Sequence, residues 1–128
     1  MERIQSLTVL LVSDMEKSKA FYQDILGCEV NEWWALRNDT INLGFKLLQA
    51  NENQAISPNS TEDEVVWDAY AYPDDFATLE NLYHEWKQKG APIVQEMAEY
   101  EFDWGTWKEF AIQDPDGYVL GIGSGNKG

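Results

Sequence analysis

The stretch Asp114-Pro115-Asp116-Gly117 carries the strongest local structural signal in this sequence. Pro115 fixes φ at the first turn position, Asp116 can hydrogen-bond to its own backbone, and Gly117 tolerates a positive φ. Strand-like runs of apolar and aromatic residues flank the stretch at 107–112 and 118–122. The stretch therefore predicts the turn of a β-hairpin that closes the chain.

The length and cysteine content limit the kind of protein this can be. With 128 residues, the chain is long enough to bury a core without the help of metals or disulfides. Cys28 is the one cysteine, which excludes an intramolecular disulfide and favours a reducing compartment. The N-terminal residues lack the long apolar run of a signal peptide or a membrane span. We therefore expect a soluble, cytoplasmic protein.

The charge is strongly acidic, with 9 basic residues against 23 acidic ones and a net charge of −14. Such a protein repels nucleic acid and anionic membranes. The acidity serves solubility, or it attracts a cationic ligand into a cleft. Six Trp and six Tyr residues are a high aromatic content for this length, and aromatic side chains commonly line small-molecule pockets.

The first half of the chain predicts a strand, a helix and further strands. Residues 4–12 form an almost continuous apolar run, typical of a strand buried on both faces. Ser13 with Glu16 resembles a capping box, and Gly27 ends the helix that follows. The remaining pattern predicts a strand at 28–36, a turn at 37–39, a strand at 40–48 and a polar linker at 49–61.

The second half repeats this order. Residues 64–72 read as a strand, and a helix then begins near Pro73 and ends at Gly90. An apolar stripe marks the buried side of that helix: Phe76, Leu79, Leu82, Tyr83 and Trp86. A strand at 93–98 and an aromatic loop at 100–105 lead into the closing hairpin. The repeated order predicts an internal duplication of about 60 residues, with modules at 1–50 and 63–124 and a linker at 51–62.

At this point the sequence resembles the vicinal oxygen chelate superfamily, the group of glyoxalases, bleomycin resistance proteins and extradiol dioxygenases. The resemblance rests on an ordered set of short motifs spread over the whole chain: Val12-Ser13-Asp14, Ser18 with Phe21-Tyr22, Leu26-Gly27, Lys89-Gly90 and Glu109-Phe110 before the Asp114–Gly117 turn. It implies an α+β fold of two βαβββ modules, whose curved mixed sheet surrounds a cleft. It also implies a homodimer, in which the partner subunit can complete the cleft.

Enzymes of this superfamily hold a divalent metal in the cleft, but the matching positions here lack suitable ligands. The position on the first strand is Leu7, and the position on the last strand is Gly121. The later position of the first module falls among residues 43–45, which are Leu, Gly and Phe. Asp68 is the one matching residue able to ligate, and a stable transition-metal site normally takes three protein ligands. We therefore expect no metal and no other cofactor.

Strand alternation predicts which side chains line the cleft. On the first strand Leu7, Val9 and Leu11 share the cleft face. On the last two strands the cleft-facing residues are expected to be Trp107, Glu109 and Ala111 and then Val119, Gly121 and Gly123. The two glycines either leave space for a ligand or permit strand twist. Glu109 either binds a cation or donor group, or accepts a structural hydrogen bond from the nearby loop.

For residues 65–72 we expect Val66, Asp68, Tyr70 and Tyr72 on the cleft side, and Val65, Trp67, Ala69 and Ala71 beneath a helix. Trp33 or Trp34 and Trp104 can complete the wall, although large aromatic residues also occur in cores. His84 lies off the apolar stripe of its helix, which predicts a solvated residue. Because His84 and Cys28 lie far apart in sequence, no nucleophile–base pair is apparent, and we assign no catalytic residue.

These features favour a metal-free small-molecule-binding protein of the bleomycin-resistance type. The expected ligand is an aromatic or cationic compound, and the residues expected to bind it are Trp33, Asp68, Tyr70, Trp104, Trp107, Glu109 and Gly121. The alternatives are a divergent glyoxalase-like lyase or isomerase that uses a divalent metal, and an interaction module whose cleft is only a dimer groove.

Overall fold

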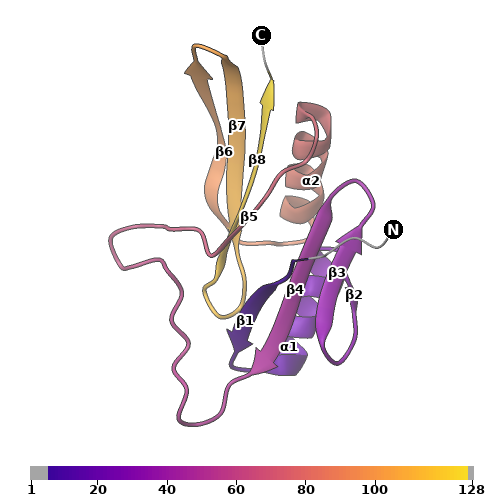
Figure 1. Ribbon diagram of the computed structural model, residues 1–128, viewed down its shortest axis with the longest axis vertical. Helices are drawn as coiled ribbons and strands as arrows, with labels where there is room; N and C mark the ends of the chain where they lie inside the picture. Colours follow the sequence, from indigo (N-terminus) through magenta and orange to yellow (C-terminus); the bar gives the residue numbers. More distant parts are fainter. Residues whose placement is uncertain (1–5, 127–128) are drawn as a thin grey trace.

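The computed structural model describes residues 6–126, which fold as two βαβββ modules (Figure 1). The expected α+β class and the two-module architecture are confirmed. The elements of the first module are β1 (Thr8–Val12), α1 (Met15–Ala20), a π-helical turn η1 (Phe21–Ile25), β2 (Glu29–Val30), β3 (Trp34–Asn38) and β4 (Asn42–Gln49). Those of the second are β5 (Ala69–Ala71), α2 (Phe76–Gln88), β6 (Ile93–Phe102), β7 (Gly105–Gln113) and β8 (Val119–Asn126).

Each module carries a four-stranded sheet, and the two sheets have the same topology. The strand orders are β1-β4-β3-β2 and β5-β8-β7-β6. In both, the first strand of the module pairs in parallel with the last, and the other pairs are antiparallel. This equivalence agrees with the duplication read from the sequence.

The first helix begins one residue later than the sequence suggested. Asp14, and not Ser13, is its N-cap, and the Asp14 side chain accepts a hydrogen bond from the Lys17 backbone N–H at 3.2 Å. Ser13 instead donates its backbone N–H to the Asp116 carboxylate of the distant closing turn at 3.2 Å. Gly27, with φ +80°, ends the helical segment as expected.

The single strand predicted at 28–36 was wrong, because two short strands, β2 and β3, occupy this region. Asn31 causes the break: its side-chain oxygen accepts the backbone N–H groups of Trp33 and Trp34 at 2.8 and 2.9 Å. This local turn reverses the chain. Because two strands form here in place of one, the module has four strands in total. β3 then continues through two residues of the turn predicted at 37–39.

Two boundaries in the second module also differ from the prediction. The strand expected at 64–72 is regular only over β5, because the preceding residues form a loop with its own hydrogen bonds. In that loop Ser60 Oγ accepts the Val66 N–H at 2.9 Å and donates to the Val66 carbonyl at 3.0 Å. The aromatic loop expected at 100–105 is mostly strand, since β6 continues to Phe102 and the chain turns at Asp103-Trp104.

The helices cover one face of each sheet and leave the other face open. On β1, Leu10 and Val12 are buried, whereas Val9 is 57% exposed, as the predicted alternation requires. In the second module Trp86 of α2 packs edge-on against Phe110 of β7, with ring centroids 5.9 Å apart. His84 is exposed, which confirms its predicted position. No helix within residues 6–126 is long and apolar enough to cross a bilayer.

The Asp114–Gly117 turn forms as predicted and also joins the two modules. The Gly117 N–H donates to the Asp114 carbonyl at 3.0 Å, and Gly117 has φ +92°. The Asp114 carboxylate accepts a hydrogen bond from the Tyr22 hydroxyl at 2.8 Å, and the Tyr118 hydroxyl donates to the Leu11 carbonyl at 2.7 Å. These contacts hold the β7–β8 hairpin against η1 and β1.

Candidate functional site

The open face of the second sheet carries most of the predicted site residues. Trp107, Glu109 and Ala111 of β7 lie directly opposite glycines of β8, in the pairs Trp107–Gly125, Glu109–Gly123 and Ala111–Gly121. Residues paired in this way share one face of a sheet. The alternation expected on β7 and β8 is therefore observed, since Trp107, Glu109 and Ala111 share one face of the sheet with Gly121 and Gly123.

Aromatic rings lie directly over these glycines. A Cβ atom on Gly121 would lie 2.6 Å from the Tyr70 ring and 2.7 Å from the Trp67 ring. One on Gly123 would overlap the Tyr70 hydroxyl and the Trp107 ring, and one on Gly125 would lie 3.0 Å from Trp107. Neither Gly121 nor Gly123 has a positive φ. They are therefore required for space, and that space is filled by the protein's own rings.

Glu109 is buried, at 8% exposed, and fixes three neighbouring side chains. Its Oε1 accepts hydrogen bonds from the Tyr70 hydroxyl at 3.0 Å and from Trp107 Nε1 at 2.9 Å. Its Oε2 accepts a hydrogen bond from Gln95 Nε2 at 2.9 Å. Burial and this bond to Glu109 raise the pKa of Tyr70 well above its ordinary value. Tyr70 is thus a neutral donor at neutral pH and not a base.

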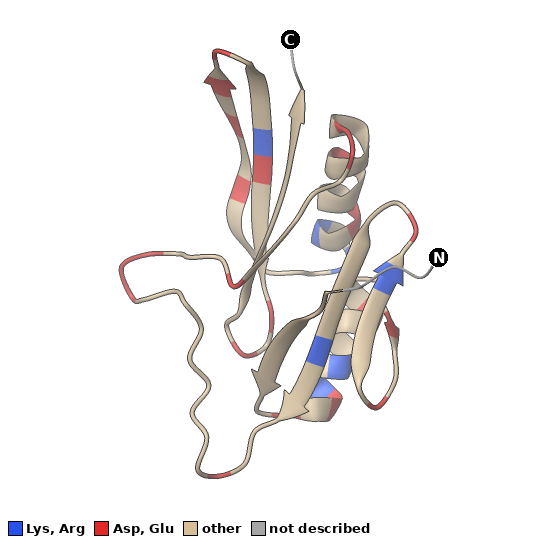
Figure 2. Ribbon diagram, in the orientation of Figure 1, with Lys and Arg blue, Asp and Glu red and all other residues tan. Residues whose placement is uncertain are grey.

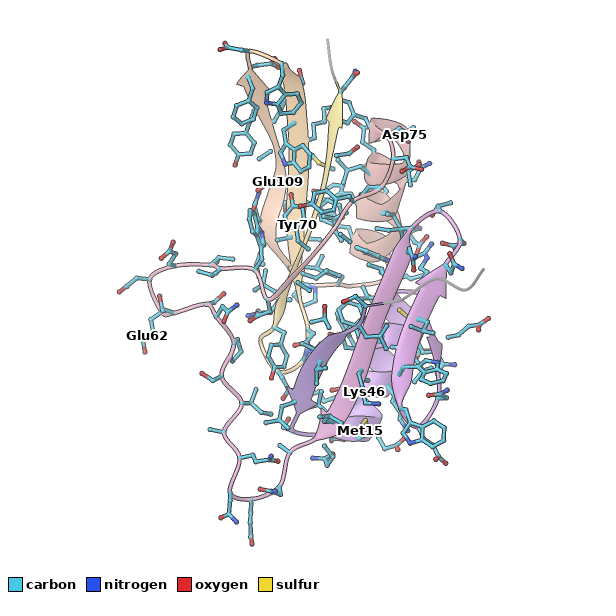
Figure 3. The ribbon with its side chains drawn as sticks, viewed as in Figure 1. Met15, Lys46, Glu62, Tyr70, Asp75 and Glu109 are labelled. Atoms are coloured by element: carbon cyan, nitrogen blue, oxygen red, sulfur yellow. The ribbon has the colours of Figure 1, made fainter. Side chains whose placement is uncertain are left out.

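The rings around Glu109 form a partly exposed aromatic surface (Figure 3). Tyr72 is 68% exposed and Trp67 42% exposed. Ring centroids are 4.6 Å apart for Trp67–Tyr70, 6.4 Å for Tyr70–Trp107 and 5.9 Å for Tyr72–Trp107. We call the set Trp67, Tyr70, Tyr72, Trp104 and Trp107 the aromatic face. Such a surface can stack on a planar ring or hold a cation over a ring face.

Trp104 extends the aromatic face to the tip of the β6–β7 hairpin. A Cβ atom on Gly125 would lie 3.2 Å from the Trp104 ring, so this ring reaches the same side of β8 as Trp107. Trp104 also stacks on Phe102, with ring centroids 5.4 Å apart and an interplanar angle of 7°. The predicted residues Tyr70, Trp104, Trp107, Glu109 and Gly121 are therefore brought together.

Asp68 and Trp33 lie elsewhere. Both carboxylate oxygens of Asp68 accept backbone N–H groups, from Asn59 and from Val119, each at 2.8 Å. Asp68 thereby ties the linker to the start of β8, while Trp67, expected beneath a helix, lies beside Tyr70. Trp33 belongs to the β2–β3 turn of the first sheet, where its aromatic neighbour is Trp34 at 6.2 Å.

Comparison with known proteins gives a consistent result. The family model described as "Glyoxalase/Bleomycin resistance protein/Dioxygenase superfamily" matches residues 3–122. This chain belongs to that superfamily. A search of curated protein sequences finds no match.

Several solved structures share the superfamily fold. A glyoxalase/bleomycin resistance protein/dioxygenase from Alicyclobacillus acidocaldarius has a TM-score of 0.67 at 16% identity, covering 98% of this chain and 95% of its own. Virulence protein STM3117 from Salmonella typhimurium has a TM-score of 0.60 at 23% identity, covering 97% of each chain. The fosfomycin resistance protein FosX from Listeria monocytogenes has a TM-score of 0.60 at 16% identity, covering 98% and 96%. At these identities the similarity shows the fold alone.

The superfamily's divalent metal does not fit the residues at the corresponding positions. Leu7 packs over Gly44, Gly121 lies beneath aromatic rings, and the oxygens of Asp68 are engaged by backbone N–H groups. Within residues 6–126, no three His, Cys, Asp or Glu side chains come together in a way that could hold a metal ion. Cys28 is buried, and burial raises its pKa to about 12, so its thiol is not an available nucleophile.

Gln95 is a residue of the candidate site that the sequence did not indicate. Ala98 pairs with Glu109, so strict alternation along β6 would place Glu96 on the Glu109 side of the sheet and Gln95 on the opposite side. Register shifts on either side of Gln95 interrupt the pairing of β6 with β7 and turn its amide toward Glu109. Nothing in the local residue pattern marks this irregularity.

Proposed function

We propose that this protein binds an aromatic or cationic small molecule on its aromatic face, without a metal, in the manner of the bleomycin resistance proteins. The observation that carries the proposal is a set of partly exposed rings, two of which, Tyr70 and Trp107, are held in place by one buried carboxylate. Because Glu109 fixes Tyr70 and Trp107, these rings lose little conformational freedom when a ligand binds. Exposed apolar surface of this kind is typical of a binding site.

The role of charge in binding is indirect. Both oxygens of Glu109 already accept hydrogen bonds, so a ligand need not form an ion pair with this residue. A cationic ligand is instead attracted by the net charge of −14 and held over the ring faces. Figure 2 shows that acidic residues are spread over the strands, helices and loops, including β6 and β7 beside the aromatic face.

A binding screen tests the proposal directly. Planar aromatic compounds, amines and glycopeptide antibiotics are titrated while Trp fluorescence and thermal unfolding are followed. Trp107→Ala should abolish binding of a hit, whereas Trp33→Ala, which removes an exposed Trp from the other sheet, should leave it unchanged. Equal effects of the two substitutions, or a screen with no hit together with unchanged drug resistance on overexpression, would overturn the proposal.

A divergent glyoxalase-like lyase or isomerase remains the alternative within the superfamily. Titration with Ni²⁺, Zn²⁺, Fe²⁺ and Mn²⁺ separates the two hypotheses. Since the corresponding positions offer at most one ligating side chain, we expect no stoichiometric binding. Tight binding of one ion per chain would favour the enzyme.

We also propose that the protein is a homodimer, with the open face of the first sheet in the interface. Val9, Trp34 and Leu48 on this face are 57%, 38% and 43% exposed, and apolar side chains grouped in this way favour association. A second copy of this chain is a suitable partner for this apolar group, because the acidic surface of that copy can pair with Lys46, which lies opposite Val9. Sedimentation should show a dimer that Val9→Asp dissociates. A monomeric wild type would contradict the assignment.

A further inference from the structure

A separate cavity lies at the seam between the two modules, next to the aromatic face. Its volume is about 280 Å³. The first module contributes Ser6 and Thr8 near the start of β1 and Asn42 at the start of β4. The second contributes Tyr70 and Tyr72, which also belong to the aromatic face. We call this space the seam cavity.

The polar side chains of the seam cavity are neutral. Apart from the phenol groups of Tyr70 and Tyr72, they are the hydroxyls of Ser6 and Thr8 and the amide of Asn42, and none of the lining residues that the structure describes is charged. Ser6 and Asn42 are exposed, and Thr8 is half-buried. Their donors and acceptors are thus available to a ligand, in a position shared with two rings of the aromatic face.

We propose that the seam cavity is a specificity subsite, which binds a neutral, hydroxyl- or amide-bearing substituent of an aromatic ligand. This inference rests on the proposed function, because Tyr70 and Tyr72 belong both to the aromatic face and to the lining of the seam cavity. Hydroxyl and amide side chains can both donate to and accept from such a substituent.

The neutral lining and the volume of the seam cavity both restrict which substituents it can bind. Within residues 6–126, no cationic side chain lines the cavity to receive a phosphate, sulfate or carboxylate, and the protein has a net charge of −14. A volume of about 280 Å³ lies just below the range of complete small-molecule sites, about 300–1,000 Å³. The cavity therefore suits one polar substituent, while the ring of the ligand remains on the aromatic face.

The test compares three forms of the same ring by calorimetry. Coumarin, naphthalene and indole are each used as the free ring, as the β-glucoside and as an anionic phosphate or sulfate ester. Wild-type protein should bind a glucoside about 3- to 10-fold more tightly than its free ring, the gain expected from one or two net hydrogen bonds. The anionic ester should bind more weakly than the free ring.

Two substitutions test whether the higher affinity for the glucoside arises in the seam cavity. Thr8→Val and Asn42→Ala should each reduce the affinity for the glucoside toward that for the free ring, without changing binding of the ring itself. Asn53→Ala, in the exposed linker, is the matched control and should change neither. Thermal unfolding checks that each variant is folded.

The possible failures are distinguishable. The proposal of a subsite is overturned if a free ring binds and its glucoside binds no better, or if the anionic ester binds most tightly. In both cases the proposed binding of rings on the aromatic face is unaffected. If Thr8→Val and Asn42→Ala both leave the glucoside unaffected, the polar group lies elsewhere, and the assignment of the seam cavity is again overturned. If no ring binds in any form, the aromatic face fails, and the proposed function fails with it.

Discussion

The open faces of the two sheets differ in chemistry although their strand orders are the same. The face of β1-β4-β3-β2 is mainly aliphatic, with Val9 and Leu48 exposed and Lys46 lying opposite Trp34 and Val9. The face of β5-β8-β7-β6 is aromatic and holds a buried carboxylate, Glu109 (Figure 3). The difference shows that the duplicated framework fixes where side chains point, while individual residues decide what each face can bind.

The positions of the glycines account for the different chemistry of the two open faces. Within the part of the chain that the structure describes, the first sheet has one open-face glycine, Gly44, which is covered by the flexible Leu7 side chain. The second has Gly121, Gly123 and Gly125 at alternate positions of β8, all covered by aromatic rings. Flat rings can lie close to a strand only where the side chain beneath them is absent. The glycines of β8 are therefore the feature that allows an aromatic face on one module only.

The largest predicted effect comes from filling the glycine positions. Gly123→Val should destabilise the protein by about 3 kcal/mol, because its side chain would overlap Tyr70 and Trp107. Gly44→Ala should cost only about 1 kcal/mol, since Leu7 can rotate away. Urea unfolding measures both values. Equal costs would mean that the two faces tolerate overpacking equally, and the contrast between them would fail.

Arg37→Ala should have the next largest effect, because Arg37 connects the first module to α2 of the second module. Arg37 of β3 is 9% exposed and donates to Glu85 of α2 at 2.8 Å and to the Leu26 carbonyl at 2.8 Å. Breaking a buried pair can cost about 3–5 kcal/mol, but Glu85 is 32% exposed and can be rehydrated. We expect a loss of about 2 kcal/mol in urea unfolding. Lys89→Ala, which removes only an exposed partner of Glu85, is the control.

Substituting Glu109 separates charge from hydrogen bonding on the aromatic face. Glu109→Ala leaves the donors of Tyr70, Trp107 and Gln95 without their acceptor and should cost about 2 kcal/mol. Glu109→Gln retains one acceptor oxygen and should cost less than about 1 kcal/mol. Near-ultraviolet circular dichroism should show altered Trp packing in the first variant only. If both variants behave alike, the charge of Glu109 matters more than its hydrogen bonds.

The smallest effect concerns pH and the closing turn. Burial raises the pKa of the Asp114 carboxyl, so ionising it costs more free energy in the folded protein than in the unfolded one. This penalty is absent below the ordinary Asp pKa of about 4 and is complete above the raised value. Asp114→Asn lacks the penalty, so its stability relative to wild type should increase as pH rises through that window. A pH-independent difference in denaturant midpoints would contradict this prediction.

Much of the fold followed from local residue patterns. The Asp114–Gly117 turn, the glycine ends of both helices and the apolar stripe of α2 depend on neighbours within a few residues, so the sequence predicts them well. The break at Asn31 was missed because an aromatic, β-branched context favours a continuous strand, whereas one side-chain hydrogen bond reverses the chain. Long β6 was missed because its end contains acidic residues that resemble a loop.

The candidate site was predicted less completely. Trp107, Glu109 and Gly121 were found because they lie on regular strands, where alternation fixes the face. Trp67 and Asp68 precede the regular part of β5, and Gln95 lies between two register shifts, so alternation fails for all three. Strand periodicity predicts a side chain's direction only where pairing is uninterrupted.

The sequence by itself determined the two-module plan, the acidic surface, the missing metal ligands and the turn at Asp114–Gly117. These features depend on composition, on periodicity and on short motifs, which act over a few residues. Tertiary structure alone decided that rings fill the space over Gly121 and Gly123, that Glu109 binds three donors, and that a neutral cavity lies beside them. Each of these depends on contacts between strands far apart in the chain, where the position of one side chain is set by the packing of its neighbours.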